Sequence, residues 1–161
     1  MEIRRAEEGD IPGIDSLLFQ VLSIHAKIRP DIFIPGTKKY TDGQLSAILS
    51  DERTPVFVAE EDGRLLGHLF CQIREIRGNA NLVARREFFL DDLCVDEAAR
   101  GRGVGRALCE YAKEYARRCG CAFVTLNVWE GNDRARRFYE AMGFGVRETQ
   151  MEFPLGEDAA R

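Results

Sequence analysis

Apolar residues recur at helical spacing in four separate stretches of the chain. Each stretch carries start or stop signals: Asp10, Thr41 and Asn132 stand where a side chain caps a helix, and Gly120 and Gly143 stand where helices end. The predicted helices cover about residues 11–25, 42–50, 104–119 and 133–142. The third has the strongest apolar face and directly follows a glycine-rich turn.

Shorter apolar runs around these helices predict strands. The predicted strands cover residues 2–5, 55–60, 65–73, 87–95 and 122–128, with a closing strand pair within 144–155. The second and third flank a turn that ends in Gly63, which predicts a hairpin. Residues 29–36 are a predicted loop, residues 77–85 are a loop or the open end of a longer hairpin, and residues 156–161 are a loose tail. The order of elements predicts one mixed α/β domain across residues 1–161.

Composition narrows the class of protein. With 161 residues, the chain suits one hydrophobic core. It has no apolar run of the roughly 18 to 20 residues that a membrane span needs, and no apolar leader, so we expect a cytoplasmic protein without a membrane partner. Five cysteines without a CxxC pair and two histidines predict no metal site. A net charge of -4 argues against a nucleic-acid partner and favours a small cationic substrate.

Residues 100–106, Arg-Gly-Arg-Gly-Val-Gly-Arg, form the most informative segment. A glycine-rich turn between a strand and a helix presents backbone N–H groups and the positive end of the helix dipole to an anion, and the three arginines add charge. An ordinary flexible loop is the alternative interpretation. A Walker loop would continue with Lys and Ser or Thr, and a dinucleotide fingerprint would have GxGxxG spacing in a first βαβ unit. The segment therefore predicts a different phosphate site.

This segment resembles the Arg/Gln-x-x-Gly-x-Gly/Ala signature with which GNAT acetyltransferases hold the CoA pyrophosphate. A second family motif is similar to Asn132-x-x-Ala135-x-x-Phe138-Tyr139-Glu140-x-x-Gly143-Phe144, and residues 3–6 and 10–12 resemble the family N-terminus. The resemblance covers nearly the whole chain. It implies an α/β (α+β) fold with four helices around a mostly antiparallel mixed sheet of six to seven strands.

The same resemblance implies acetyl-CoA as co-substrate, with its pantetheine arm between splayed fourth and fifth strands at residues 88–95 and 122–128. The residues that it assigns to acetyl-CoA are Leu93, Cys94, Val95, Arg100, Gly101, Arg102, Gly103, Val104, Gly105, Arg106, Asn132 and Ala135. Backbone N–H groups near residues 93–95 would stabilise the oxyanion of the transition state. Asn132 has two compatible roles, as helix cap and as contact to the CoA arm.

Acetyl transfer to an amine needs a base, because an amine with a pKa of about 10.4 is protonated at neutral pH. The run Phe-Leu-Asp-Asp-Leu-Cys-Val resembles one in polyamine acetyltransferases and nominates Asp91, through a bridging water, with Asp92 as acceptor contact. Neighbouring strand residues face opposite ways, so we expect only one aspartate in the cleft. Either aspartate could instead pair with an arginine or cap a turn. Family analogy makes Tyr139 the acid that protonates the CoA thiolate.

The remaining candidates concern the acceptor. His25 and Trp129 would line its site, although single residues of these types more often pack in cores. Cys94 as acyl carrier is disfavoured because no histidine is near in sequence. A small cationic, polyamine-like amine is the favoured acceptor. The alternatives are a protein N-terminus or lysine, and a non-catalytic acyl-CoA sensor; a homodimer is a further expectation from the family.

Overall fold

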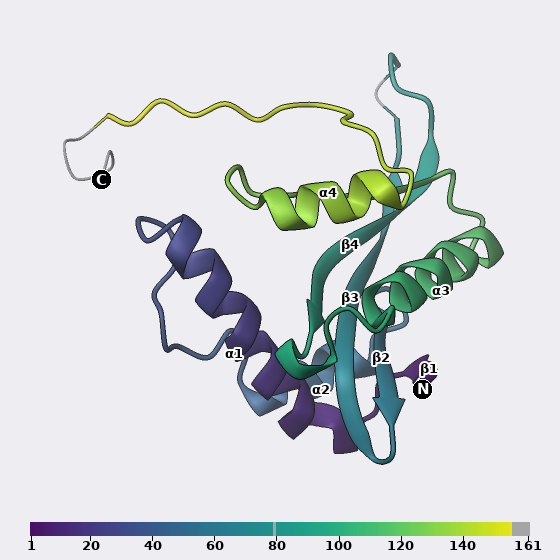
Figure 1. Ribbon diagram of the computed structural model, residues 1–161. Helices are drawn as coiled ribbons and strands as arrows, with labels where there is room; N and C mark the ends of the chain where they lie inside the picture. Colours follow the sequence, from purple (N-terminus) through teal and green to yellow (C-terminus); the bar gives the residue numbers. More distant parts are fainter. Residues whose placement is uncertain (79, 156–161) are drawn as a thin grey trace.

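The computed structural model describes residues 1–78 and 80–155. Its elements are β1 (Glu2–Arg5), α1 (Ile11–Ile28), α2 (Asp42–Ser50), β2 (Val56–Glu61), β3 (Arg64–Ile76), β4 (Arg85–Val95), α3 (Val104–Arg118), β5 (Phe123–Leu126) and α4 (Asp133–Ala141). The sheet has the order β1-β2-β3-β4-β5, antiparallel except for the parallel pair β4–β5 (Figure 1). All four predicted helices and the mixed α/β class are confirmed.

The sheet separates two hydrophobic cores. On one face, α1 and α2 bury Ile14 and Leu45 against Val58 and Phe70 of the strands. On the other face, α3 and α4 cover the sheet, with Leu108 fully buried in that core. Figure 1 shows α1 and α3 on opposite sides of β3 and β4. Strands that are buried on both faces read as continuous apolar runs, as β2 and β3 do.

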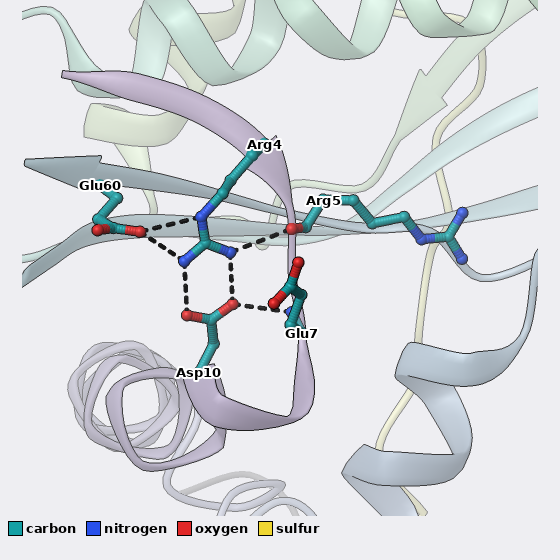
Figure 2. Close-up of polar contacts among 5 residues, drawn as sticks. All are labelled: Arg4, Arg5, Glu7, Asp10 and Glu60. Atoms are coloured by element: carbon teal, nitrogen blue, oxygen red, sulfur yellow. Dashed lines mark hydrogen bonds and ion pairs between the residues drawn. The ribbon is translucent and has the colours of Figure 1, made fainter. Parts of the chain in front are cut away.

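The two N-terminal helices begin in different ways. Thr41 and Gln44 form the predicted capping box before α2, with reciprocal side-chain to backbone hydrogen bonds of 3.2 and 2.8 Å. Asp10 precedes α1 as predicted, but its carboxylate does not cap the helix. It accepts two hydrogen bonds from Arg4, at 2.7 and 2.8 Å, and Arg4 also binds Glu60 of β2 (Figure 2). Asp10 therefore fixes the start of α1 to the sheet.

The predicted closing strand pair at residues 144–155 is wrong. Within the described residues the sheet has five strands rather than six or seven, and 144–155 run as an irregular extended segment. The segment leaves the end of α4 and runs across the molecule as an extended chain, and it pairs with no strand of the described sheet (Figure 1). The predicted tail at 156–161 lies outside the described residues. Among the helices of the described chain, none is both long and apolar enough to cross a membrane.

A bulge interrupts the pairing of β3 and β4 at the centre of the sheet. Phe70 pairs with Asp92 and Cys71 pairs with Leu90, so Asp91 is an additional residue on β4. A bulge bends its strand and breaks the alternation of side chains between the two faces. The bulge lies immediately after the last pair between β4 and β5, Leu90 with Leu126. The bulge therefore lies at Asp91, the predicted base, and next to Asp92, the predicted acceptor contact.

Candidate active site

The glycine loop between β4 and α3 has the backbone that an anion site needs. Gly101 and Gly103 have φ angles of 80° and 82°, which residues with a Cβ rarely adopt. A Cβ at either position would meet no atom within 4 Å, so the space in front of the loop is open. Gly103 is the N-cap of α3 and supplies no side chain to its first N–H groups. The buried Val104 anchors the start of the helix.

The third glycine and the arginines of this loop have different roles. A Cβ at Gly105 would lie 3.4 Å from the ring of Phe138, so this position keeps α3 close to α4. Arg102 is bound by Glu61 at the β2–β3 turn, and Arg100 lies 3.5 Å from Glu97. Arg106 is exposed. Two of the three predicted cationic groups are therefore shared with carboxylates of the protein, which the loop sequence alone did not indicate.

Strands β4 and β5 separate beyond Leu90, as the resemblance predicted. β4 continues to Val95 without β5 beside it, so residues 91–95 present a free backbone edge on that side in the described part of the chain. Leu93 and Val95 pack toward α3, whereas Cys94 is buried on the α1 side. Burial raises the pKa of the Cys94 thiol to about 12, which disfavours a thiolate nucleophile. This edge is suited to backbone hydrogen bonds.

Both aspartates of β4 approach one ammonium group. Lys39, from the loop before α2, donates a hydrogen bond of 2.8 Å to Asp92 and has its Nζ 3.9 Å from Asp91 Oδ2. The side chain of Asp92 is 4% exposed and that of Asp91 is 29% exposed. Both carboxylates therefore lie near the same ammonium group, and the bulge at Asp91 interrupts the strict alternation on which the expectation of a single aspartate in the cleft rested.

His68 is a site residue that the sequence analysis missed. It is fully buried on β3, where its Nε2 lies 3.4 Å from Asp92 Oδ1. Its Nδ1 is buried without a hydrogen-bond partner among the described residues. The available signal was a histidine inside an apolar strand run, because buried polar groups are normally paired.

The ionised form of the Asp92 carboxyl is strongly favoured. Burial by itself would raise the pKa of this carboxyl, but the hydrogen bond with His68 and the charges of His68 and Lys39 outweigh burial and lower the pKa to about 2. Burial also opposes the charge of Lys39, yet the neighbouring Asp92 carboxylate raises the pKa of the lysine. Asp92 and Lys39 therefore form an ion pair at neutral pH.

Tyr139 lies on α4, in contact with aromatic rings of Phe138 and Phe144 at centroid distances of 5.1 and 5.6 Å. Burial raises the pKa of its phenol, and the nearby Cys109 thiol and Asp92 carboxylate add to the shift. The hydroxyl therefore stays protonated at neutral pH, as a general acid requires.

The start of α4 confirms one of the two roles expected for Asn132. Its Oδ1 accepts a hydrogen bond of 3.2 Å from the backbone N–H of Ala135, which is the predicted cap. This contact fixes the loop between β5 and α4 beside the separated strands. The second expected role, a contact to the CoA arm, stays a prediction.

The two aromatic acceptor candidates meet through a third ring. Phe33 lies 5.2 Å from His25 and 5.4 Å from Trp129, measured between ring centroids. Arg29 lies over the Trp129 ring at 5.6 Å. Burial lowers the pKa of His25, while the Asp92 charge acts in the opposite direction. The end of α1 thus contacts the loop before α4. Through Phe33, His25 and Trp129 belong to one continuous aromatic surface.

A separate hollow of about 480 Å³ lies at the start of α1 and the β2–β3 turn. Its charged side chains bind one another: Arg4 contacts Asp10 and Glu60 (Figure 2), and Arg64 contacts Asp96 at 2.8 Å. It contains neither a β4 aspartate nor Tyr139. The hollow therefore does not belong to the site described above.

Residues 20–144 match the model of the Acetyltransferase (GNAT) family. That match covers most of the chain. The chain belongs to the GNAT family. The glycine loop, the separated strands and Tyr139 all lie within the matched residues.

Relatives agree with this assignment. The chain is 29% identical over 144 residues to an uncharacterized N-acetyltransferase, YhfO, of Bacillus subtilis (strain 168), covering 89% of each chain. A crystal structure of a mutant BH1408 protein from Bacillus halodurans has a TM-score of 0.92 at 29% identity, covering 96% of this chain and 99% of that one. This GNAT protein is therefore an N-acetyltransferase in fold and class.

A more distant structure shows the same fold with a ligand. The aminoglycoside N-acetyltransferase AAC(6')-Iy, solved in complex with CoA, has a TM-score of 0.73 at 19% identity, covering 95% of this chain and 98% of that one. At this identity the likeness establishes the fold alone.

Proposed function

We propose that this GNAT protein transfers the acetyl group of acetyl-CoA to a small primary amine by direct attack in a ternary complex. The observation that carries the proposal is the β4 bulge, which places Asp91 and Asp92 around one ammonium group. The ammonium group of Lys39 lies 2.8 Å from Asp92 and 3.9 Å from Asp91, and this arrangement supports a site that is suited to a protonated amine. The buried phenol of Tyr139, whose pKa is raised, supplies a proton donor in the same matched region.

The residues present fit acetyl-CoA. The open space before Gly101 and Gly103 leaves the backbone of the loop accessible to a pyrophosphate at the N-terminus of α3. The free edge of β4 at residues 91–95 offers hydrogen bonds to the pantetheine amides, as the separated strands suggest. Bound acetyl-CoA supplies an activated thioester carbonyl. Backbone N–H groups near residues 93–95 would stabilise the charge that develops on its oxygen.

The two aspartates are suited to different tasks. Asp92, with a pKa of about 2 and an ion pair to Lys39, is too weak a base to remove a proton from an ammonium group. Asp91 is the more exposed of the two and lies 3.9 Å from the same nitrogen. We therefore assign proton removal to Asp91, through a water where the short side chain does not reach, and orientation of the acceptor to Asp92.

The contact between Lys39 and Asp92 also restricts the class of acceptor that suits the site. It neutralises Asp92, so the two aspartates together present about one net negative charge to a substrate. That arrangement suits an acceptor with one ammonium group at this position, rather than several as in a polyamine. His25, Phe33 and Trp129 provide an apolar wall for the rest of the molecule.

The test is release of CoA from acetyl-CoA with a series of monoamines, diamines, amino sugars and peptides. Asp91→Asn and Tyr139→Phe should each lower kcat about 100-fold on the best acceptor, because each removes one proton-transfer group. The effect of Asp91→Asn should be smaller at alkaline pH, where more of the amine is already neutral.

Matched controls separate catalysis from folding. Asp62→Asn lies in the β2–β3 turn, where φ is 52° and asparagine is tolerated, and Tyr111→Phe lies on α3. Both should retain the activity of the unchanged chain. Tight binding of acetyl-CoA without turnover on any amine would contradict the proposal and favour an acyl-CoA sensor.

A further inference from the structure

Lys39 is the one lysine in the described part of the chain whose ammonium group contacts the aspartates of β4. Its Nζ lies 2.8 Å from Asp92 Oδ2 and 3.9 Å from Asp91 Oδ2. The neighbouring Lys38 binds Asp15 at 2.6 Å instead. A primary amine of the chain itself therefore lies beside the carboxylate to which we assign proton removal.

Aromatic packing holds the segment of Lys39 against the sheet. The ring of Tyr40 stacks on Phe70 of β3 at a centroid distance of 6.0 Å, and Phe70 is the residue that pairs with Asp92 beside the bulge. Lys39 Nζ also lies 5.2 Å from the centroid of the Tyr40 ring. The side chain of Lys39 is 35% exposed, so solvent reaches it. The segment before α2 thus places an accessible amine at the two aspartates.

The other groups that acetyl transfer requires lie near this amine. The free edge of β4 at residues 91–95, where we propose that acetyl-CoA binds, begins at Asp91. Burial raises the pKa of the Tyr139 phenol, and the charges of Cys109 and Asp92 add to the shift, so the proposed acid lies within the electrostatic field of the carboxylate that binds Lys39. Lys39 is therefore placed as a substrate amine would be.

We propose that Lys39 is a site of self-acetylation: when no amine acceptor is bound, the chain transfers the acetyl group of acetyl-CoA to its own Lys39 Nζ. This inference rests on the proposed function, because it uses the same base, acid and acetyl-CoA site. Lys39 belongs to the chain that catalyses the reaction, so its attack is intramolecular and gains from a high effective concentration.

The reaction balances without a further reactant. Asp91 takes a proton from the Lys39 ammonium, through a water where its carboxylate does not reach, and passes it to solvent. The neutral nitrogen attacks the thioester carbonyl, so a C–N bond forms and the C–S bond breaks. Tyr139 gives a proton to the leaving sulfur, and the second proton that the nitrogen loses replaces it. The products are an acetamide on Lys39, the CoA thiol and one released proton.

Acetylation changes the charge of the acceptor site. It removes the Lys39 cation and leaves His68 as the remaining hydrogen-bond partner of Asp92 among the described residues. The two aspartates then present more negative charge to a substrate. Self-acetylation therefore shifts the preference of the enzyme toward acceptors with two ammonium groups.

Mass spectrometry of the intact full chain after incubation with acetyl-CoA alone tests this inference. The chain should gain the mass of one acetyl group, and fragmentation of the peptide that contains Lys38 and Lys39 should place the group on Lys39. The rate constant should not change with protein concentration, because the reaction is intramolecular. Asp91→Asn and Tyr139→Phe should each lower it about 100-fold.

Lys38 separates enzymatic transfer from spontaneous acetylation by the thioester. Its side chain is 51% exposed, against 35% for Lys39, and hydrogen bonds with Asp15 and Asp42 raise its pKa as well. A spontaneous reaction should therefore modify Lys38 at least as fast and should not respond to Asp91→Asn. Lys39→Arg keeps the cation and should abolish the modification, whereas Lys38→Arg should leave it unchanged. Circular dichroism shows whether each variant is folded.

A second readout needs no turnover. Freed of acetyl-CoA, the modified chain should unfold at a lower urea concentration than the unmodified chain, because the buried Asp92 has lost its cation. An unchanged midpoint would mean that the acetyl group is not on the nitrogen that binds Asp92, and would overturn the inference.

Assays with the series of amines keep this inference separate from the proposed function. Turnover of an amine by a chain that acetyl-CoA alone leaves unmodified at Lys39 would overturn self-acetylation and leave the proposed function intact. Equal modification of Lys38 and Lys39, or a rate constant that rises with protein concentration, would also overturn self-acetylation. Modification of Lys39 that Asp91→Asn slows, in a chain that acetylates no free amine, would support self-acetylation and contradict the proposed small-amine acceptor.

Discussion

The two halves of the active site are built in different ways. The glycine loop at the start of α3 is one contiguous segment, and it acts through backbone geometry at Gly101 and Gly103. The acidic cluster is assembled from side chains of three separate parts of the chain: Lys39 before α2, His68 on β3 and the aspartates on β4. The loop therefore depends on the absence of a Cβ at its glycines, whereas the cluster depends on contacts between side chains from separate parts of the chain.

The largest expected effect on stability concerns Asp92 in the acidic cluster. The pKa of this carboxyl is lower in the folded chain than its ordinary value of 3.8, so its ionisation stabilises the fold. That contribution is present above about pH 4 and is lost as the pH falls through about 2. A shift of that size corresponds to about 2 kcal/mol. Asp92→Asn should therefore lower the free energy of unfolding by about 2 kcal/mol at pH 7.

Urea denaturation at pH 7 and at pH 3 checks this prediction, with Asp91→Asn as the matched variant. Asp91 is more exposed and lacks the buried histidine contact, so its loss should change stability by less than about 0.5 kcal/mol. The difference between unchanged chain and Asp92→Asn should shrink at the lower pH. Equal stability losses in the two variants would show that the cluster does not divide into a structural and a catalytic carboxylate.

The glycine loop should respond to the addition of a single carbon. Gly103 has a φ of 82° at the N-cap of α3, and a Cβ there costs about 1 to 2 kcal/mol. The methyl group would also enter the open space before the loop. Gly103→Ala should raise the KM for acetyl-CoA about tenfold, with little change in kcat.

Gly43→Ala is the control for this substitution. Gly43 lies near the start of α2, has open space around it and is not in the left-handed region, so alanine should be neutral or stabilising. Initial rates at varied acetyl-CoA concentration give both KM values. An unchanged KM in Gly103→Ala would mean that the loop backbone does not position acetyl-CoA.

The same contrast explains what could be predicted from the sequence. The loop, the caps at Thr41 and Asn132, and the four helices are local patterns, and they were predictable because neighbouring residues determine them. The bulge at Asp91 depends on the register between β3 and β4, which local periodicity does not report. The pairing of Lys39 and His68 with Asp92 joins residues far apart in the chain, so no spacing indicates it.

The prediction of a closing strand pair at residues 144–155 was wrong for a related reason. The alternation in residues 151–155 indicates strand character, but a strand needs a partner, and residues 144–155 pair with no strand of the described sheet. The alternation of apolar residues indicates that a segment can form a strand, but the tertiary fold determines whether another strand lies beside it. Residues 144–155 are therefore the segment whose position in the fold sequence periodicity could not predict.

The smallest expected effect concerns the specificity that Lys39 confers. Its side chain is 35% exposed, so solvent screens its charge, and an ion pair of this kind contributes at most about 1 kcal/mol. Lys39→Gln leaves Asp92 without its cation and makes the site more negative. A diamine should then gain relative to a monoamine of equal length by up to about fivefold in kcat/KM.

The ratio of kcat/KM values for the two amines is the relevant measurement, because a general loss of stability or activity cancels in it. Lys38→Gln is the matched control: Lys38 is a neighbouring lysine whose ammonium binds Asp15 at 2.6 Å and also Asp42, away from the aspartates of β4. Its ratio should equal that of the unchanged chain. A ratio unaffected by Lys39→Gln would show that the second carboxylate does not sense the charge of the acceptor, and the acidic cluster would then act through Asp91 alone.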